Sequence, residues 1–181
     1  MNRTCGDCQL CCRLMPVREI PGKDAGVKCR HQCRKGCGIY ERRPISCKAF
    51  ACQWLLGMDT GQRPDRSHLV VDPMPDFVTA VSHDDGSEQK IAVIQVWIDP
   101  DHKDAHRDPA FRRWLDGKKR PAMIRFDSHR GFLLVPPSAC SEREWIEVDS
   151  NISESEPEHT LQETIEAVGD QLDDIEIRVT P

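Results

Sequence analysis

The stretch Cys5-Gly6-Asp7-Cys8-Gln9-Leu10-Cys11-Cys12 places four thiols within eight residues near the start of the chain. Thiols two or three residues apart are able to bind one metal ion together. Further cysteines follow at Cys29, Cys33, Cys37, Cys47, Cys52 and, far downstream, Cys140. Because the cysteine-rich segment contains few aliphatic residues from which to build a core, we expect bound metal to be part of its fold.

The bulk composition is that of a globular protein. The chain has 181 residues, of which 38% are hydrophobic and 30% charged, and this length suffices for one domain or a domain with a small module. No apolar run reaches the length of a membrane span, and the first residues lack the apolar region of a signal peptide. We therefore predict a cytoplasmic protein with no membrane contact, whose reduced thiols bind metal instead of forming disulfides.

The adjacent pair Cys11-Cys12 indicates more than one metal position. Neighbouring side chains point about 100° apart on a helix and to opposite sides of a strand. The two thiols are therefore not expected to chelate one ion as an isolated pair. Either they serve two metals or one of them is a packed thiol, and the first alternative predicts a dinuclear site or two sites close together.

An ordinary ferredoxin site is disfavoured. Its pattern is Cys-x2-Cys-x2-Cys-x3-Cys-Pro, and Cys5, Cys8 and Cys11 match the first three positions. The fourth position holds Met15, although Pro16 follows it. The proline is present and the fourth ligand is missing.

The spacing over a longer stretch resembles a known family. Cys5-x2-Cys8-x2-Cys11-Cys12 is followed by Cys37-Gly-Ile-Tyr40-Glu-Arg-Arg43-Pro44-x2-Cys47, and then by Phe50 and Cys52. These motifs are similar to the CxxCxxCC cysteine-cluster family, which is described as a zinc- or iron-chelating domain. The resemblance covers about residues 5–57 and leaves residues 58–181 uncovered. It implies metal chelation by Cys5, Cys8, Cys11, Cys12, Cys29, Cys37, Cys47 and Cys52.

The metal itself stays open at this point. All-thiolate sites suit zinc, iron and iron–sulfur clusters, so the expected cofactor is zinc or iron, including an iron–sulfur cluster. Cys33 is additional to the family set, and Cys140 has no neighbouring cysteine and is expected to be a packed or free thiol. His31 lies between Cys29 and Cys33, where an exposed loop position is favoured over a ligand or supporting role.

The net charge of −5 is unevenly distributed. Residues 1–66 carry a surplus of +7, and residues 67–181 carry −12. Eight thiolates with two divalent ions would leave a negative site, and basic residues nearby would compensate it. Contact with nucleic acid is the weaker explanation of the same surplus. The basic residues considered are Arg13, Lys28, Arg30, Arg34, Lys35, Arg42, Arg43 and Lys48.

Three segments are expected along the chain. Residues 1–57 form a cysteine-cluster metal-binding module, residues 58–149 an α+β segment, and residues 150–181 an acidic linker with a helix and a strand. The fold class is α+β, with a small cysteine-rich, metal-stapled N-terminal module followed by a mainly antiparallel sheet with one or two helices.

The elements follow from periodicity and turn signals. One helix is expected from Pro44 to Gly57, and another begins at Asp108-Pro109 and ends near Gly117. A capping box at Thr160 predicts a third helix. Alternation and turn signals predict strands over residues 68–72, 77–82, 91–98, 122–126, 132–135, 144–148 and 175–179.

The remaining candidates favour ordinary structural roles. His102 and His106 are four residues apart and with Asp99 have metal-ligand spacing, but they lie among charges and a solvated face is expected. The four tryptophans are expected to be core or edge aromatics.

Three functions remain open. The first is a non-catalytic metal-binding protein that chelates zinc or iron through about eight thiolates. The second is an iron or iron–sulfur protein that supports an oxidative or modifying reaction. The third is a zinc-stabilised module that binds nucleic acid or protein. No phosphate-binding loop, nucleophile elbow or acid–base carboxylate pair indicates a reaction.

Overall fold

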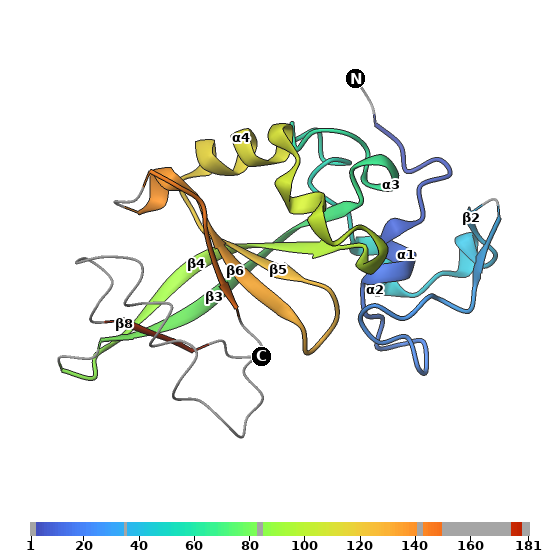
Figure 1. The fold of residues 1–181 in the computed structure, drawn as a ribbon. Helices are drawn as coiled ribbons and strands as arrows, with labels where there is room; N and C mark the ends of the chain where they lie inside the picture. Colours follow the sequence, from blue (N-terminus) through green and yellow to red (C-terminus); the bar gives the residue numbers. More distant parts are fainter. Residues whose placement is uncertain (1–2, 35, 83–84, 141–142, 150–174, 179–181) are drawn as a thin grey trace.

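The computed structural model describes residues 3–34, 36–82, 85–140, 143–149 and 175–178. Within them the fold is α+β, as expected, with one six-stranded sheet, a small hairpin and short helices (Figure 1). The helices are α1 (Leu10–Leu14), η1 (Tyr40–Arg42), α2 (Ile45–Ala49), α3 (Pro64–Ser67), η2 (Pro100–Arg107), α4 (Pro109–Lys118) and η3 (Pro137–Ala139). The strands are β1 (Gln32–Cys33), β2 (Gly36–Cys37), β3 (Leu69–Ser82), β4 (Glu88–Ile98), β5 (Ala122–Arg125), β6 (Gly131–Val135), β7 (Ile146–Asp149) and β8 (Ile175–Arg178).

The sheet has the strand order β7-β6-β5-β4-β3-β8. β3 and β4 are antiparallel neighbours, and β8 pairs antiparallel with β3. After β4 the chain crosses over through η2 and α4 to β5, which is parallel to β4. β5, β6 and β7 continue as antiparallel neighbours. The sheet is therefore mainly antiparallel with one parallel pair, because a helical crossover separates β4 from β5.

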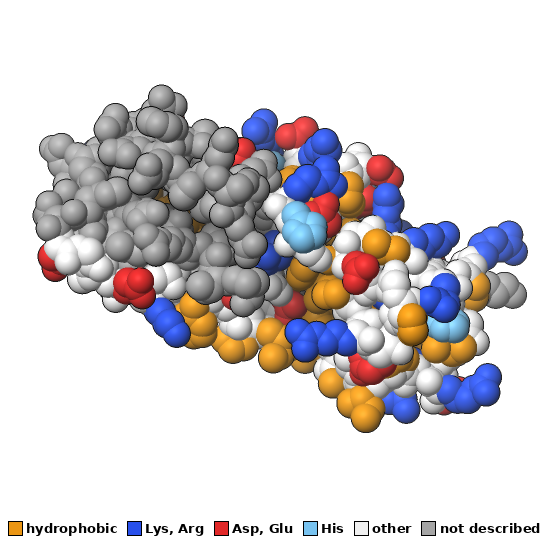
Figure 2. All heavy atoms as spheres, turned by 90° about the horizontal axis from the view of Figure 1, so that it is seen from below, with side chains coloured by type: hydrophobic (Ala, Val, Ile, Leu, Met, Phe, Trp, Pro, Cys, Tyr) orange, Lys and Arg blue, Asp and Glu red, His pale blue; other side chains and the backbone are white. Residues whose placement is uncertain are grey.

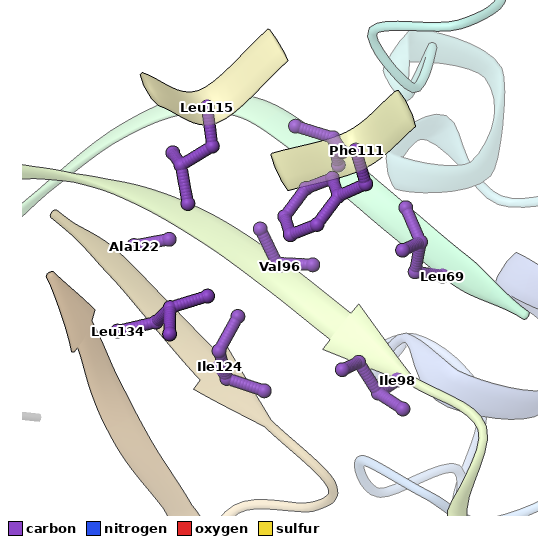
Figure 3. Close-up of a cluster of buried hydrophobic side chains, with 9 residues drawn as sticks. Leu69, Val96, Ile98, Phe111, Leu115, Ala122, Ile124 and Leu134 are labelled. Carbon is purple, nitrogen blue, oxygen red and sulfur yellow. The ribbon is translucent and has the colours of Figure 1, made fainter. Parts of the chain in front are cut away.

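The larger core lies between α4 and one face of the sheet (Figure 3). Asp108 begins the helix as its N-cap, with Oδ1 accepting hydrogen bonds from the backbone N–H groups of Ala110 and Phe111, both at 2.9 Å. Phe111 and Leu115 then point from α4 onto the sheet, and both are fully buried. The sheet side of this core consists of Leu69, Val71, Val96, Ile98, Ala122, Ile124 and Leu134.

The opposite face of the sheet carries a second cluster, which includes Val78, Val93 and Leu133. Cys140 packs against this cluster, far from the other cysteines in sequence. Its expected role as a packed thiol is confirmed.

The cysteine-rich segment packs against the end of the sheet where β3 begins and β4 ends. Leu10 and Leu14 of α1 share a cluster with Val70 of β3 and Trp97 of β4, and Leu14 is completely buried. These contacts come from alternate sheet residues, so Val70 and Trp97 face α1 while their neighbours face α4. The segment thus shares a core with the sheet.

Two predicted elements differ from the structure. The helix predicted from Pro44 to Gly57 is shorter in the structure. It is α2, which ends at Ala49, because Phe50 is already extended at φ −72° and ψ 126°. The backbone N–H of Gln53 donates to the carbonyl of Val71 on β3, at 2.9 Å, which draws the chain onto the sheet. The strands predicted over residues 68–72 and 77–82 are one strand, β3, with an irregular register between Val71 and Pro75.

The other predicted elements fall into two groups. The strand signals over residues 91–98, 122–126, 132–135, 144–148 and 175–179 are confirmed within one or two residues, apart from an earlier start of β4. The predicted acidic linker and the helix at Thr160 lie outside the described residues. Among the helices that the structure does describe, none has the length and apolarity to cross a membrane.

Candidate metal centre

A cavity of about 600 Å³ lies among the short elements of the cysteine-rich segment. All eight cysteines that were expected as ligands line it: Cys5, Cys8, Cys11, Cys12, Cys29, Cys37, Cys47 and Cys52. None of the ten cysteines, all of which lie among the described residues, is in a disulfide. Cys33 is exposed and does not line the cavity, and Cys140 lies on the far side of the sheet core. The fold thus separates the eight expected ligands from the two doubtful cysteines.

Local structure explains how residues up to 47 positions apart meet at one cavity. A turn precedes α1, with the N–H of Cys8 donating to the carbonyl of Cys5 at 2.9 Å. Cys11 and Cys12 lie on α1 itself, and the N–H of Cys29 donates to the carbonyl of Cys12 at 3.0 Å. These backbone contacts hold the loop that carries Cys29 against the helix.

The later cysteines reach the cavity through a hairpin and an early helix end. Cys37 pairs with Gln32 across the β1–β2 hairpin, and Gly36 begins β2 at φ 125°, a conformation that favours glycine. Cys47 lies in α2, and Cys52 follows it after the helix has ended. A continuous helix would have placed these two thiols on different faces, so the extended backbone at Phe50 is what lets both reach the cavity.

The thiols surround the cavity without converging on a single point. Among the described residues, the one group whose three potential ligand atoms all lie within 4.8 Å of one another is His68, Asp99 and His102. Four thiolates around one zinc ion at about 2.3 Å would stand roughly 3.8 Å apart. Closing around single ions would therefore need rotation of cysteine side chains.

The adjacent thiols of Cys11 and Cys12 share a hydrogen bond, and each thiol also has neighbours of its own. The hydrogen bond between Cys11 and Cys12 is the main cause that raises the pKa of the Cys11 thiol, followed by burial and by the nearby Cys8 and Cys5. The same bond lowers the pKa of Cys12 to about 7, opposed by burial and assisted by the charge of Lys23. Cys12 is thus the member of the pair that ionises first.

Packing places five of the eight thiols in two groups. Cys8 and Cys52 pack against the cluster that includes Leu10 and Leu14, whereas Cys12 and Cys47 pack against Val17, Ile20 and Cys29. Electrostatic neighbours agree with this division in part. Cys11 interacts first with Cys12 and then with Cys8 and Cys5, and Cys52 interacts with Cys5. Burial is the main cause that raises the pKa of Cys47, followed by Cys12, and Cys29 and Cys37 contribute as well.

We use these contacts to group the eight thiols into two sets of four. We call them the first set (Cys5, Cys8, Cys11 and Cys52) and the second set (Cys12, Cys29, Cys37 and Cys47). We assign Cys11 and Cys12 to different sets because neighbouring helix side chains diverge, although a hydrogen bond still joins the two thiols.

Lys23 is a buried cation beside the second set and was missed in the sequence. It is only 3% exposed, and its ammonium donates to the backbone carbonyls of Met15 and Asp24. Burial lowers the pKa of Lys23, whereas Cys29, Cys12 and other thiols act to raise it. Its position in a loop rich in Pro, Gly and charge concealed it, because such a loop predicts solvent exposure.

Arg43 is a second cation at the cavity, and it interacts with one cysteine of each set. Its guanidinium lies over the Tyr40 ring at 3.8 Å from the centroid. The hydrogen bond to Tyr40 raises the pKa of Arg43, with further contributions from Cys37 and Cys5. Within the described part of the chain, the buried Nε atom of Arg43 makes no hydrogen bond. A buried N–H donor of this kind favours negative charge in the cavity.

The surplus of basic residues is only partly explained by the cavity. Lys23, Arg43 and Lys48 line it, together with His31, whereas Arg13 pairs with Asp99 and Asp101 outside it. Other Lys and Arg side chains project from the end of the molecule that carries this segment (Figure 2). Lys35 lies outside the described residues.

Comparisons with known proteins add no relative. No protein-family model, curated protein or solved structure matches the chain. The similarity to the cysteine-cluster family therefore stays a prediction from the motifs, and the arguments that follow depend on the residues themselves.

Proposed function

We propose that this protein binds metal through the eight cavity cysteines, as two four-thiolate centres that share the adjacent pair on α1. The observation that carries the proposal is that the motifs and the cavity, considered separately, identify the same eight cysteines. The resemblance to the cysteine-cluster family selects eight of the ten cysteines, and the same eight line one cavity. The packing of Cys8 and Cys52 in one cluster, and of Cys12, Cys29 and Cys47 in another, supports assigning the first and second sets to separate centres.

The donor set fits zinc or iron. Thiolates are the ligands that zinc and iron–sulfur clusters favour. Two divalent ions with eight thiolates carry a charge of about −4 by formal counting, and Lys23 and Arg43 lie where they would offset part of it. A closed set of four thiolates leaves no coordination position for substrate, which supports a non-catalytic role.

A second candidate function is supported by the size of the cavity. A volume of about 600 Å³ exceeds what two bare ions need, and the thiols do not converge within 4.8 Å. Thiolates that bind different iron atoms of one cluster stand farther apart than those on one ion. Iron–sulfur clusters held by the same two sets would supply electron transfer for an oxidative or modifying reaction.

Matched substitutions test the two-centre proposal. Cys47→Ser and Cys52→Ser each remove one thiol from one set, whereas Cys33→Ser and Cys140→Ser remove thiols outside the cavity. Protein purified without oxygen is analysed for metal and visible absorption. We expect each of the first two variants to lose one centre and retain the other, and the two controls to match the wild type. Equal losses from Cys33→Ser would contradict the proposal.

Visible absorption separates the two candidates. Colourless protein with stoichiometric zinc would exclude the iron–sulfur candidate for the native cofactor. A broad visible absorption with iron and sulfide would support it. Binding to DNA or RNA with a steep salt dependence would instead favour the third function, a zinc-stabilised nucleic-acid module.

A further inference from the structure

A second type of ligand set lies outside the cavity. His68 follows α3, Asp99 lies between β4 and η2, and His102 lies in η2. The Asp99 Oδ2 atom is 3.9 Å from His68 Nδ1 and 3.4 Å from His102 Nδ1. Ligand atoms on one ion bound at about 2.1 Å are separated by roughly 3 to 3.5 Å, so these spacings are close to those of a bound state.

The backbone ties the three residues together. The N–H of Asp99 donates to the carbonyl of His68 at 3.0 Å, and the N–H of His102 donates to the carbonyl of Asp99 at 2.8 Å. Asp99 is 4% exposed, and its Oδ1 accepts from the N–H of Asp101 at 3.1 Å. The carboxylate is therefore held in place, with Oδ2 directed to the two rings.

Both histidines have unusual backbone conformations. His68 has φ 59° and ψ 21°, the left-handed region that a side chain other than glycine adopts at a cost. His102 interrupts η2 with φ −131° and ψ 55°. The rings stack with their centroids 3.4 Å apart and 7° between their planes. The left-handed backbone at His68 is a kind of strain that clusters at functional sites.

We propose that His68, Asp99 and His102 bind a divalent transition-metal ion of the zinc and iron class. Two imidazole nitrogens and one carboxylate oxygen are ligands that such ions favour. Three protein ligands leave at least one coordination position for water or a small ligand, unlike the four-thiolate centres. The exposed ring of His102 rotates to direct its nitrogen at the ion. This site is independent of the cysteine centres.

Arg13 makes the proposal more specific. Its guanidinium lies 3.1 Å from Asp99 Oδ2 and 2.6 Å from Asp101 Oδ2. A dication at Asp99 would repel this charge, and Asp101 remains as the partner of Arg13. Arg13→Gln is therefore expected to tighten metal binding roughly tenfold, because one positive charge near the ion is removed.

Cobalt titration tests the site on the full chain. Protein that already carries its thiolate metal is titrated with Co²⁺ and followed by absorption. Cobalt at nitrogen and oxygen ligands gives weak visible bands, whereas cobalt at thiolates also gives strong near-ultraviolet charge transfer. The two kinds of centre are therefore distinguished, and failure of the cysteine proposal does not affect this test.

The expected result is one Co²⁺ bound without thiolate absorption. His102→Ala and His68→Asn should weaken it by at least about tenfold, since even supporting residues of metal sites contribute that much. Asparagine at position 68 is chosen because it tolerates the left-handed backbone. His129→Ala, on an exposed turn, is the control and should bind like the wild type. Equal affinity of His102→Ala and wild type, or no cobalt bound without thiolate absorption, would overturn the proposal.

Discussion

Replacing Lys23 with methionine tests whether the cavity carries the negative charge of bound thiolates. Methionine is unbranched and nearly fills the same space, so the substitution removes charge with little change in packing. Lys23 is 3% exposed, and its ammonium has backbone carbonyls as hydrogen-bond acceptors. A buried ammonium costs several kcal/mol unless negative charge lies nearby.

The size of the effect follows from Coulomb's law. One thiolate at about 5 Å from the ammonium, with an effective dielectric constant of about 20, contributes roughly 3 kcal/mol. Cys12, Cys29 and Cys47 all interact with Lys23, although bound metal cancels part of their charge. We therefore expect Lys23→Met to weaken metal binding on the order of 100-fold, at 1.4 kcal/mol for each factor of ten.

Competition with a coloured chelator under anaerobic conditions measures the affinity. Lys48→Met is the matched control, because Lys48 also lines the cavity but is exposed, so water already screens its charge. We expect the control to change affinity by less than about threefold. Wild-type affinity in Lys23→Met, or an equal loss in both variants, would refute the argument that Lys23 compensates buried thiolates.

Four further predictions concern stability. Metal removal by a chelator at about pH 7 should unfold residues 1–57, and unchanged circular dichroism and tryptophan fluorescence in metal-free protein would contradict this. Burial is the main cause that raises the pKa of Asp72, which is 5% exposed. The folded state therefore holds this proton more tightly than the unfolded state, and the stability from Asp72 falls as pH rises from the unfolded to the folded pKa. Asp72→Asn should then increase the free energy of unfolding at neutral pH and have little effect below the ordinary carboxyl pKa, as urea denaturation at several pH values would show. Leu115→Ala removes a fully buried side chain and should cost about 2–5 kcal/mol, with metal content unchanged; a cost below 1 kcal/mol would contradict the packing of α4. Asp108→Ala should cost about 1 kcal/mol through loss of the N-cap, measured against Asp104→Ala on the exposed side of η2.

Most of the sheet was predictable because its signals are local. Apolar residues recur along β3, β4, β5 and β6, and turn residues separate the strands. The start of α4 was equally clear, since aspartate followed by proline caps a helix through contacts within four residues. The parallel pairing of β4 with β5 was not specified, because pairing direction depends on how the crossover packs and not on either strand alone.

In the cysteine-rich segment, local sequence patterns no longer predict the structure correctly. Helical spacing from Cys47 to Leu55 predicted a continuous helix, but a long-range hydrogen bond from Gln53 to Val71 competes with it. Propensity is a weak preference that tertiary contacts override. For the same reason, Lys23 could not be identified as buried from a loop rich in proline and glycine.

The histidine group shows most clearly how the sequence prediction and the tertiary structure differ. Metal-ligand spacing suggested His102 and His106 with Asp99, but His106 is buried and lies between the carbonyl of Lys103 and the carboxylate of Glu147. The solvated face expected for this pair is therefore wrong for His106. His68, more than thirty residues away, takes the place beside His102 because β3 and β4 run side by side.

By itself, the sequence predicted the ligand chemistry: eight thiols match the cysteine-cluster family that the chain resembles, and adjacent Cys11 and Cys12 either serve two metals or include one packed thiol. Side-chain direction along the chain decides the second of these predictions. Only the tertiary structure decided that all eight thiols border one cavity and that Lys23 lies among them. Those relations join residues far apart in the chain, and packing against the sheet, not local preference, brings them together.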